Sequence, residues 1–437
     1  MVNYHRFFFE SMILFIKLMI QLPKKLDVEP ILYSNTHKRF SSNKSTPEQT
    51  LCLKNPADRK TWGFIVIDNT IRGQGLGGIR MVSDLTLTEV KRLAKIMTLK
   101  NSLAQLPFGG AKVGVILDSE NFRDIPELRA DFFAIFAEAI FTVDNFIPAP
   151  DMGTNESDIQ IINETFSKKL GTSQHGRGGV SRPADKGGVP IDDWGLTAHG
   201  LLASVRSLEQ LESGFAIKDS RVIVQGYGNV GASIAQKLSM NGACIVGASD
   251  INAALWHPFG LDINELNRVR TLPGGLCHYK KAETRRFFGD RLDWLIEAPC
   301  DLLIPCARPD SITSRNADRL ECGYILQGAN SPCNKMTEYY LWNRRGILSL
   351  SDIVVNSGGV IGCAAELKMI LDRKFKKKVE THNTRSWIED RVCRTVTQNV
   401  SEVYRRFRES KNDSIFREQA ENLSKERLQA DHQQIWL

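Results

Sequence analysis

Two lysines set twelve residues apart are the residues of this chain best suited to chemistry. Lys100 lies late in a helical pattern, and Lys112 follows the double glycine Gly109-Gly110 and opens the apolar stretch Val113 to Leu117. Two ammonium groups held close together lower each other's pKa, and burial lowers it further. A lysine with a pKa near neutrality can act on a carbonyl substrate, which an exposed lysine cannot. The alternative is two surface lysines with solvated ammonium groups.

A carboxylate in a proline-shaped turn is the third candidate. Asp151 follows Phe146-Ile147-Pro148-Ala149-Pro150, which reads as a strand, and it precedes Met152-Gly153-Thr154. A carboxylate between two lysines stays ionised, while a second ammonium and burial push Lys112 towards neutrality. Alone, Asp151 could equally be a turn or helix-capping residue.

A dinucleotide-binding pattern lies in the second half of the chain. The predicted strand 221–225 runs into Gly226-Tyr227-Gly228-Asn229-Val230-Gly231, and a helix follows up to Met240. A second strand, Cys244 to Ala248, leads to Asp250, which lies 19 residues beyond Gly231. G-x-G-x-x-G between a strand and a helix, with an acid at this distance, is the fingerprint of a Rossmann domain.

Each part of the fingerprint has a physical role. Gly226 permits the tight turn, Gly228 lets the backbone approach a pyrophosphate, and Gly231 packs the helix on the strand. The N–H groups at the helix N-terminus, around Asn229 and Val230, would bind phosphate. Asp250 would accept hydrogen bonds from a ribose diol and repel a 2′-phosphate, so NAD is favoured and NADP is not excluded.

The elements that must position these residues alternate between strands and helices. Thr86 and Glu89 form a plausible capping box, and Val90, Leu93, Ala94 and Met97 then define one helical face that ends near Lys100. The other predicted helices are Ile125 to Ile140 and Asp192 to Gln210, with a loop between Gly171 and Gly188. Further strands are predicted at Gly63 to Asp68, Leu302 to Pro305, Tyr324 to Gln327 and Ile353 to Val355, the last three ending beside Ala307, Asn330 and Asn356.

Composition limits the classes of function. The chain has 437 residues, 42% of them hydrophobic, and a net charge of +7. This charge is spread over many residues, and no sequence motif for nucleic-acid binding accompanies it. The 9 cysteines show neither a disulfide framework nor zinc-ligand spacing, so we expect no metal and a reducing compartment. The apolar stretch Phe7 to Leu22 is too short and too polar to span a membrane.

The motifs, taken in order, resemble the glutamate/leucine/phenylalanine/valine dehydrogenase family. The matching pieces are Leu76-Gly77-Gly78-Ile79-Arg80-Met81, Met97 to Asn101, Pro107 to Lys112, Pro148 to Gly153, Leu196 to Gly200, Gln225 to Gly231, Gln327 to Pro332 and Asn356 to Val360. The resemblance implies reversible oxidative deamination of an L-amino acid to its 2-oxo acid and ammonia.

The resemblance also implies roles for single residues. Lys100 matches the lysine that binds the substrate α-carboxylate, Lys112 matches the catalytic lysine, and Asp151 matches the proton carrier. The double glycine Gly77-Gly78 belongs to the same substrate site. Thr197 matches a position beside the nicotinamide, and Ala307, Asn330 and Asn356 are expected around the cofactor and substrate cleft.

Two departures from the glutamate enzymes bear on the substrate. Leu76 stands where they have a lysine before the double glycine, and Cys363 stands where they have a serine. Both changes remove polar partners for a γ-carboxylate, so the pocket resembles that of the leucine and valine enzymes and predicts a non-acidic amino acid. Two alternatives are a glutamate dehydrogenase with other carboxylate-binding groups, and a cofactor-binding regulatory paralogue without turnover.

The expected fold class is α/β. A mixed α/β substrate-binding and oligomerisation domain, 56–190, precedes a Rossmann domain, 191–363, and C-terminal helices, 364–437, pack back across both. Residues 1–55 are expected to be a poorly structured or targeting extension. The protein is therefore predicted to be cytoplasmic, or mitochondrial if the extension is a transit peptide, and a homo-oligomer of six or eight subunits, as the family resemblance implies.

Overall fold

A computed structural model describes most of the chain. It covers residues 22–31, 47–122, 125–173, 177–287, 292–381, 383–410 and 414–430. The basic, serine-rich stretch Ser34 to Lys44, on which the targeting prediction rests, lies outside the described residues.

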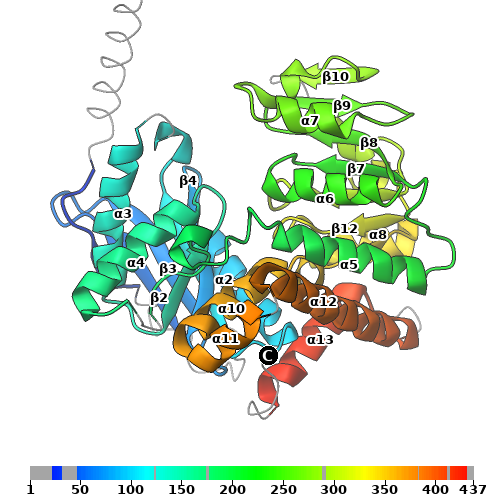
Figure 1. Ribbon diagram of the computed structural model, residues 1–437. Coiled ribbons are helices and arrows are strands. Elements are labelled where there is room, and N and C mark those ends of the chain that lie inside the picture. Colours follow the sequence, from blue (N-terminus) through cyan, green and yellow to red (C-terminus); the bar gives the residue numbers. More distant parts are fainter. Residues whose placement is uncertain are drawn as a thin grey trace, which may run out of the picture.

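The first lobe is built on a mixed sheet, coloured blue to cyan in Figure 1. Its strand order is β1-β2-β3-β5-β4-β6, with β4 parallel to both β5 and β6 and the other pairs antiparallel. The strands are β1 Asp27–Pro30, β2 Gln49–Lys54, β3 Thr61–Asn69, β4 Gly75–Val82, β5 Gly109–Ile116 and β6 Phe146–Pro150. The helices are α2 Leu87–Leu103, α3 Pro126–Ile140 and α4 Glu156–Leu170, with the short 3-10 helices η2 Ser119–Phe122 and η3 Ala184–Lys186.

The second lobe is a Rossmann-type domain on a separate sheet. Its strand order is β10-β9-β8-β7-β11-β12-β13. In this order, the five neighbouring strands β8, β7, β11, β12 and β13 are parallel. The strands are β7 Arg221–Gln225, β8 Cys244–Ser249, β9 Ala253–Trp256, β10 Thr284–Phe287, β11 Leu302–Pro305, β12 Tyr324–Leu326 and β13 Leu348–Leu350. The helices are α5 Leu196–Leu211, α6 Asn229–Met240, α7 Ile263–Val269, α8 Lys335–Arg345 and α9 Asp352–Val355, with η4 Gly275–His278, η5 Leu292–Glu297 and η6 Ala317–Arg319.

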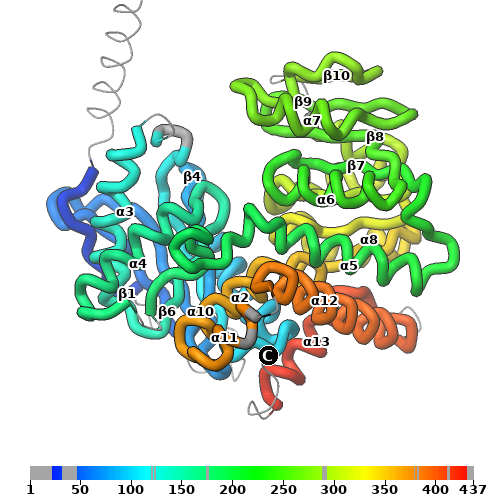
Figure 2. The backbone as a smooth tube through the Cα atoms, in the orientation of Figure 1, coloured from blue at the N-terminus to red at the C-terminus, as the bar shows by residue number. Residues whose placement is uncertain are grey.

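Four C-terminal helices pack against the lobes: α10 Gly358–Leu371, α11 Arg373–Thr381, α12 Thr384–Glu409 and α13 Phe416–Gln429. Figure 2 shows α10 and α11 beneath the first lobe and α12 and α13 beneath the second. The Asn399 amide of α12 donates to the Leu103 carbonyl (3.0 Å), and the Ser102 hydroxyl of α2 donates to the Ser424 carbonyl (2.7 Å). The predicted architecture of two α/β domains bridged by C-terminal helices is confirmed.

Local sequence explains how the elements near the cleft begin. Thr86 caps α2 by accepting a hydrogen bond from the Glu89 N–H, and Val90, Leu93 and Ala94 are buried as the periodicity predicts. Asn155 and Asp158 form a complete capping box at α4, immediately after the turn that carries Asp151. These caps fix the ends of the elements beside the predicted site.

Two expectations about elements are wrong. Ile353 to Val355 is part of helix α9, and the strand in this region is β13; a short, fully buried apolar run does not show its period. Organised structure also begins before Thr61, because β1 and β2 extend the first sheet within the stretch 1–55 that was predicted to be poorly structured.

One stretch of the described chain, Asp352–Leu371, is long and apolar enough to cross a bilayer. Its apolar window is 78% buried inside the protein, which is the environment of a core helix.

Candidate active site

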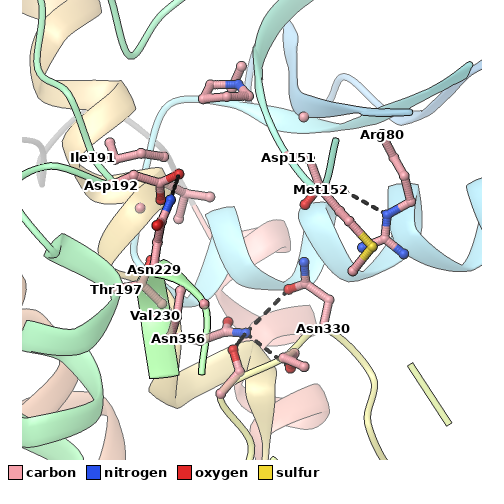
Figure 3. A pocket seen from close by; sticks show the side chains of 18 of the residues that line it. Arg80, Asp151, Met152, Ile191, Asp192, Thr197, Asn229, Val230, Asn330 and Asn356 are labelled. Atoms are coloured by element: carbon pink, nitrogen blue, oxygen red, sulfur yellow. Dashed lines mark hydrogen bonds and ion pairs between the residues drawn. The ribbon is translucent and has the colours of Figure 1, made fainter. Parts of the chain in front are cut away.

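Three charged side chains converge on three neighbouring strands of the first lobe. Lys112 comes from β5, Asp151 follows β6, and Arg80 comes from β4, which lies between these two strands. The Lys112 Nζ lies 2.8 Å from Asp151 Oδ2, and the Arg80 Nε donates to the same oxygen at 2.9 Å. Figure 3 shows the Arg80 and Asp151 side chains pointing toward each other. The lysine and arginine side chains are each only 3% exposed, so the cluster is shielded from water.

Burial and charge set the protonation of this cluster. Burial raises the pKa of the Asp151 carboxyl, but Arg80 and Lys112 outweigh it and hold that pKa well below its usual range. Burial lowers the pKa of the Lys112 ammonium, and Arg80 lowers it further against the opposing charge of Asp151. A stable anion therefore lies beside a lysine that can release its proton easily.

Lys100 is the fourth charged group, and it reaches the cleft from the last turn of α2. Lys100 is 3% exposed, and its Nζ donates a hydrogen bond to the side-chain oxygen of Asn330 in the second lobe at 2.9 Å. Burial lowers the pKa of the Lys100 ammonium to about 8, and the nearby Lys112 charge contributes to the shift. Asn356 donates to the Gly328 carbonyl (3.0 Å) and to Asn330 Oδ1 (3.3 Å), which fixes the acceptor that Lys100 uses.

The three fingerprint glycines meet different surroundings. A Cβ on Gly231 would lie 1.9 Å from the Gly226 carbonyl oxygen, so this glycine allows close packing of α6 on β7. Gly226 has a φ of +93°, and a Cβ there would lie 2.6 Å from the Ala307 nitrogen. A Cβ on Gly228 would meet no heavy atom within 4 Å among the described residues, so open space lies above the start of α6.

This arrangement fits a nicotinamide dinucleotide. Open space at Gly228 beside the free N–H groups of α6 suits a pyrophosphate. The Asn356 Oδ1 is buried without a partner in the described part of the chain, as expected of an acceptor that awaits a ligand. When bound there, the nicotinamide would supply hydride acceptance and donation.

A cleft of about 380 Å³ between the lobes brings most of the predicted site residues together. Those in its lining are Leu76, Gly78, Lys100, Lys112, Asp151, Thr197, Gly228, Asn229, Val230, Gly231, Ala307, Asn330, Asn356 and Cys363. The lysines are thus neither surface residues nor far apart in the fold.

Three predicted residues do not line this cleft. Gly77 faces β5, where a Cβ would lie 1.8 Å from the Ala111 carbonyl oxygen, so its role in the described structure is steric. Gly226 lies beneath Ala307, as described above. Asp250 follows β8 as predicted, but its carboxylate accepts the backbone N–H groups of Asn252 and Ala253 (both 2.8 Å) and Leu276 (2.7 Å). Its contact with a ribose stays a prediction.

Three charged residues of the cleft, Arg80, Asp192 and Arg308, were not among the predicted site residues. Arg80 lies two residues after Gly78 and therefore on the same face of β4. Because side chains alternate along a strand, this spacing indicated that Arg80 faces the same cleft as Gly78. Asp192 lies before α5 and accepts a hydrogen bond from the Asn229 amide (3.2 Å). Burial raises the pKa of the Asp192 carboxyl. No pattern around Asp192 marked it, because its neighbours in space come from distant segments.

Comparisons with known proteins agree with this geometry. The family described as glutamate/leucine/phenylalanine/valine dehydrogenase matches residues 187–434, and its dimerisation domain matches residues 47–168. Glutamate dehydrogenase of Thermotoga maritima is 34% identical over 301 residues, 68% of this chain and 70% of the relative. The NADP-specific glutamate dehydrogenase of Saccharolobus shibatae is 31% identical over 300 residues, 68% of this chain and 69% of the relative.

A solved structure shares the fold. The hetero-hexameric glutamate dehydrogenase of Thermus thermophilus, in its leucine-bound form, superposes with a TM-score of 0.72 at 23% identity, covering 93% of this chain and 88% of the other. The chain therefore belongs to the glutamate/leucine/phenylalanine/valine dehydrogenase family, and it is an NAD(P)-dependent amino-acid dehydrogenase acting on the CH–NH2 group of its substrate.

Proposed function

We propose that this dehydrogenase oxidises an amino acid with a non-acidic, aliphatic side chain such as leucine or valine. The observation that supports this is Leu76, which is buried and lines the cleft immediately before the double glycine. Met97, Ala149, Ile191 and Val360 add apolar lining. Burial raises the pKa of the Cys363 thiol well above its usual value, so this residue also presents a neutral side chain.

The cationic side chains in the described lining of the cleft are paired with carboxylates or proposed to bind the α-carboxylate, so none is left for a γ-carboxylate. The described lining contains Arg80, Lys100, Lys112 and Arg308. Arg80 is paired with two carboxylates, and Lys112 is paired with Asp151. Lys100 is the group proposed for the α-carboxylate, while the Arg308 side chain is 69% exposed and lies 3.3 Å from Asp84. A buried γ-carboxylate would cost several kcal/mol without a cation of its own.

Glutamate is the second candidate substrate. The curated relatives described above are named glutamate dehydrogenases, and they share about a third of their aligned residues with this chain. Under this alternative, Arg308 or another rim group would have to bind the γ-carboxylate in place of a lysine at position 76.

A panel of substrates separates the two candidates. We expect kcat/KM for leucine or valine to exceed that for glutamate with NAD or NADP, and Leu76→Lys to move the ratio toward glutamate by roughly 10²-fold. Leu76→Met is the matched control, because it keeps an apolar side chain of similar volume. A higher kcat/KM for glutamate in the unaltered enzyme would overturn the aliphatic assignment in favour of glutamate.

The proposed mechanism assigns each charged group one task. Lys100 binds the α-carboxylate and orients Cα toward the nicotinamide site, where the substrate loses its hydride. Lys112, with its lowered pKa, accepts a proton from the water that adds to the resulting imino acid, and Asp151 stabilises the ammonium that forms. Lys112 then returns this proton to the amino group of the carbinolamine, the C–N bond breaks, and the hydroxyl proton leaves with the nitrogen, which gives the 2-oxo acid and ammonium. Closure of the lobes excludes bulk water from these steps.

Lys112→Met tests this mechanism and the alternative of a protein without turnover. Methionine fills the buried space of the lysine stem, and Arg80 still neutralises Asp151, so the fold should persist. We expect kcat to fall by roughly 10³-fold, within the range for loss of a general base. A thermal melt and NAD binding serve as controls, and unchanged turnover would remove Lys112 from the mechanism.

A homo-oligomer assembled through the first lobe is part of the proposal. Support comes from the family's dimerisation domain, which matches residues 47–168. The mass in solution, measured by light scattering after gel filtration, should correspond to a hexamer or octamer of the 49.1 kDa chain. A monomeric mass would contradict it.

A further inference from the structure

A buried arginine connects the proposed catalytic carboxylate to a residue on the neighbouring helix. Arg80 is 2% exposed, and its Nε donates to Asp151 Oδ2 at 2.9 Å. Its Nη1 donates to Glu89 Oε1 at 2.6 Å, on the first turn of α2. The Glu89 side chain is 23% exposed, so the row Lys112, Asp151, Arg80, Glu89 runs from the cleft to the rim.

The position of Glu89 departs from the local pattern. Thr86 and Glu89 have the spacing of a capping box, in which the glutamate carboxylate would turn back to the helix start. The Thr86 hydroxyl does accept the Glu89 N–H, at 3.2 Å, but the carboxylate is bonded to Arg80. A cap partner has thus become the counter-ion of a buried arginine.

Both cations contact one oxygen of Asp151. Lys112 Nζ lies 2.8 Å from Oδ2, and Arg80 donates to Oδ2 as well. Within the described residues, no bond is made to Oδ1. Two bonds to one oxygen fix the carboxylate plane and leave the other oxygen free for water or substrate.

We infer that Arg80 and Glu89 are positioning residues for amino-acid oxidation: Arg80 holds Asp151 against Lys112, and Glu89 balances the charge of Arg80. The inference rests on the proposed roles of Lys112 and Asp151. It adds two residues that act on the reacting atoms through other groups.

The two residues act on Lys112 with opposite signs. Besides burial, which lowers the pKa of Lys112 most, the positive charge of Arg80 lowers this pKa and the negative charge of Glu89 raises it. The other charged groups near the cluster are Asp151 on the β6 side, Lys100 on α2 and Asp192 from the second lobe. Arg80 also lowers the pKa of Asp151, so its removal shifts both members of the pair upward.

The test is the pH profile of kcat/KM, measured on the full-length enzyme with its best amino-acid substrate. The acid limb rises as the Lys112–Asp151 pair loses its proton. We expect Arg80→Gln to move this limb to higher pH by roughly one unit, and Glu89→Gln to move it to lower pH by a smaller amount. The double variant should lie between them, and Arg80→Lys should restore most of the limb position.

Lys95→Gln is the control for Glu89→Gln. Lys95 lies further along α2 and is exposed. The control also removes one charge from α2, yet it should leave the acid limb where the unaltered enzyme has it. A general loss of stability would lower the whole profile without displacing the limb.

The outcomes distinguish the inference from the function beneath it. Shifts of the same sign in both variants, or no shift in either, would overturn the inference while amino-acid oxidation stands. An unaltered enzyme that oxidises no amino acid would overturn the proposed function instead. If Arg80→Gln does not fold, Glu89→Gln and Arg80→Lys still decide, because Glu89 is partly exposed and lysine keeps the charge.

Discussion

At the scale of the residue, the two lysines differ in what faces them. Lys112 faces an anion of its own lobe, Asp151, whereas Lys100 reaches across the cleft to the neutral oxygen of Asn330. A lysine beside a carboxylate is suited to proton transfer, because the ion pair compensates for burial. A buried lysine bonded to an amide oxygen retains an uncompensated charge, which suits binding of a carboxylate ligand.

This difference predicts how ligand binding depends on pH. Burial lowers the pKa of Lys100 from its ordinary value of 10.5 to about 8, so its ammonium form is lost as the pH rises through 8. A ligand carboxylate needs that ammonium, and its affinity should therefore fall about tenfold per pH unit above 8. The measurement is the inhibition constant of 4-methylpentanoate, which carries a carboxylate and no amino group to titrate.

Lys100→Arg provides the control, because arginine stays protonated across this range. The variant should bind the carboxylate less tightly at neutral pH but with little change on going to higher pH. An inhibition constant of the unaltered enzyme that stays flat well above pH 8 would show that Lys100 does not bind this group.

At the scale of the element, helices and strands with a periodic pattern of apolar residues could be predicted from the sequence. Elements whose ends or type depend on contacts with distant segments could not. The apolar face of α2, the β7–α6 fingerprint and the proline-rich β6 all have local periods or steric signatures, and all are found near their predicted positions. Helix α5 starts at Leu196 instead of Asp192, because Gly195 takes a left-handed conformation with a φ of +61°. Helix α9 was read as a strand because a run buried on all sides has no polar face.

The candidate site shows the same division. Lys112 and Asp151 could be predicted because the glycines before Lys112 and the prolines before Asp151 mark special backbone. Lys100 could be predicted from the apolar face of its helix, and the family resemblance connects all three residues. Glu89 was predicted as a cap partner from its spacing, but its carboxylate pairs with Arg80 in β4. That contact depends on how α2 packs on the sheet, which local sequence does not encode.

The fingerprint glycines give a prediction for the β7–α6 turn. Gly228→Ala should leave the free energy of unfolding unchanged, because no heavy atom of the described residues lies within 4 Å of the added Cβ. It should weaken NAD binding by about tenfold or more, because the added methyl group would meet the pyrophosphate. Gly231→Ala should instead destabilise the protein by about 1–3 kcal/mol, because its Cβ would overlap the Gly226 carbonyl. Thermal melts and titration with NAD measure the two effects separately.

The comparison has its own control. Gly214 lies in a surface turn with open space around it, and Gly214→Ala should change neither stability nor NAD affinity. If Gly228→Ala bound NAD as tightly as the unaltered protein, the pyrophosphate would not lie over this glycine.

At the scale of the whole molecule, the C-terminal helices tie the lobes together on one side of the cleft. Arg417 of α13 is buried and bonds to Glu338 of α8 and to Asp352 of α9, at 2.9 and 3.0 Å. The Arg72 guanidinium of the first lobe donates to the Arg427 carbonyl of the same helix (2.8 Å). Helix α13 therefore contacts both lobes and joins them.

Exposed ion pairs also join the two lobes. Arg92 of the first lobe forms a two-point contact with Asp310 of the second, at 2.8 and 3.0 Å, and Arg308 lies 3.3 Å from Asp84. These side chains are more than a third exposed, so each pair contributes little energy and responds to salt. Weak pairs at the mouth suit a cleft that must open in every turnover.

Reversing one of these charges should therefore weaken closure without harming the fold. We expect Arg92→Glu to raise KM for the amino acid about threefold, because its new charge repels Asp310 in the closed state. The exchange Arg92→Asp with Asp310→Arg should restore it, and added salt should raise KM in the unaltered enzyme but not in the single variant. Arg268→Glu, which breaks an exposed pair within α7 away from the cleft, is the control and should change nothing. A KM that ignores both the charge reversal and the salt would mean that closure is governed by the buried side of the cleft alone.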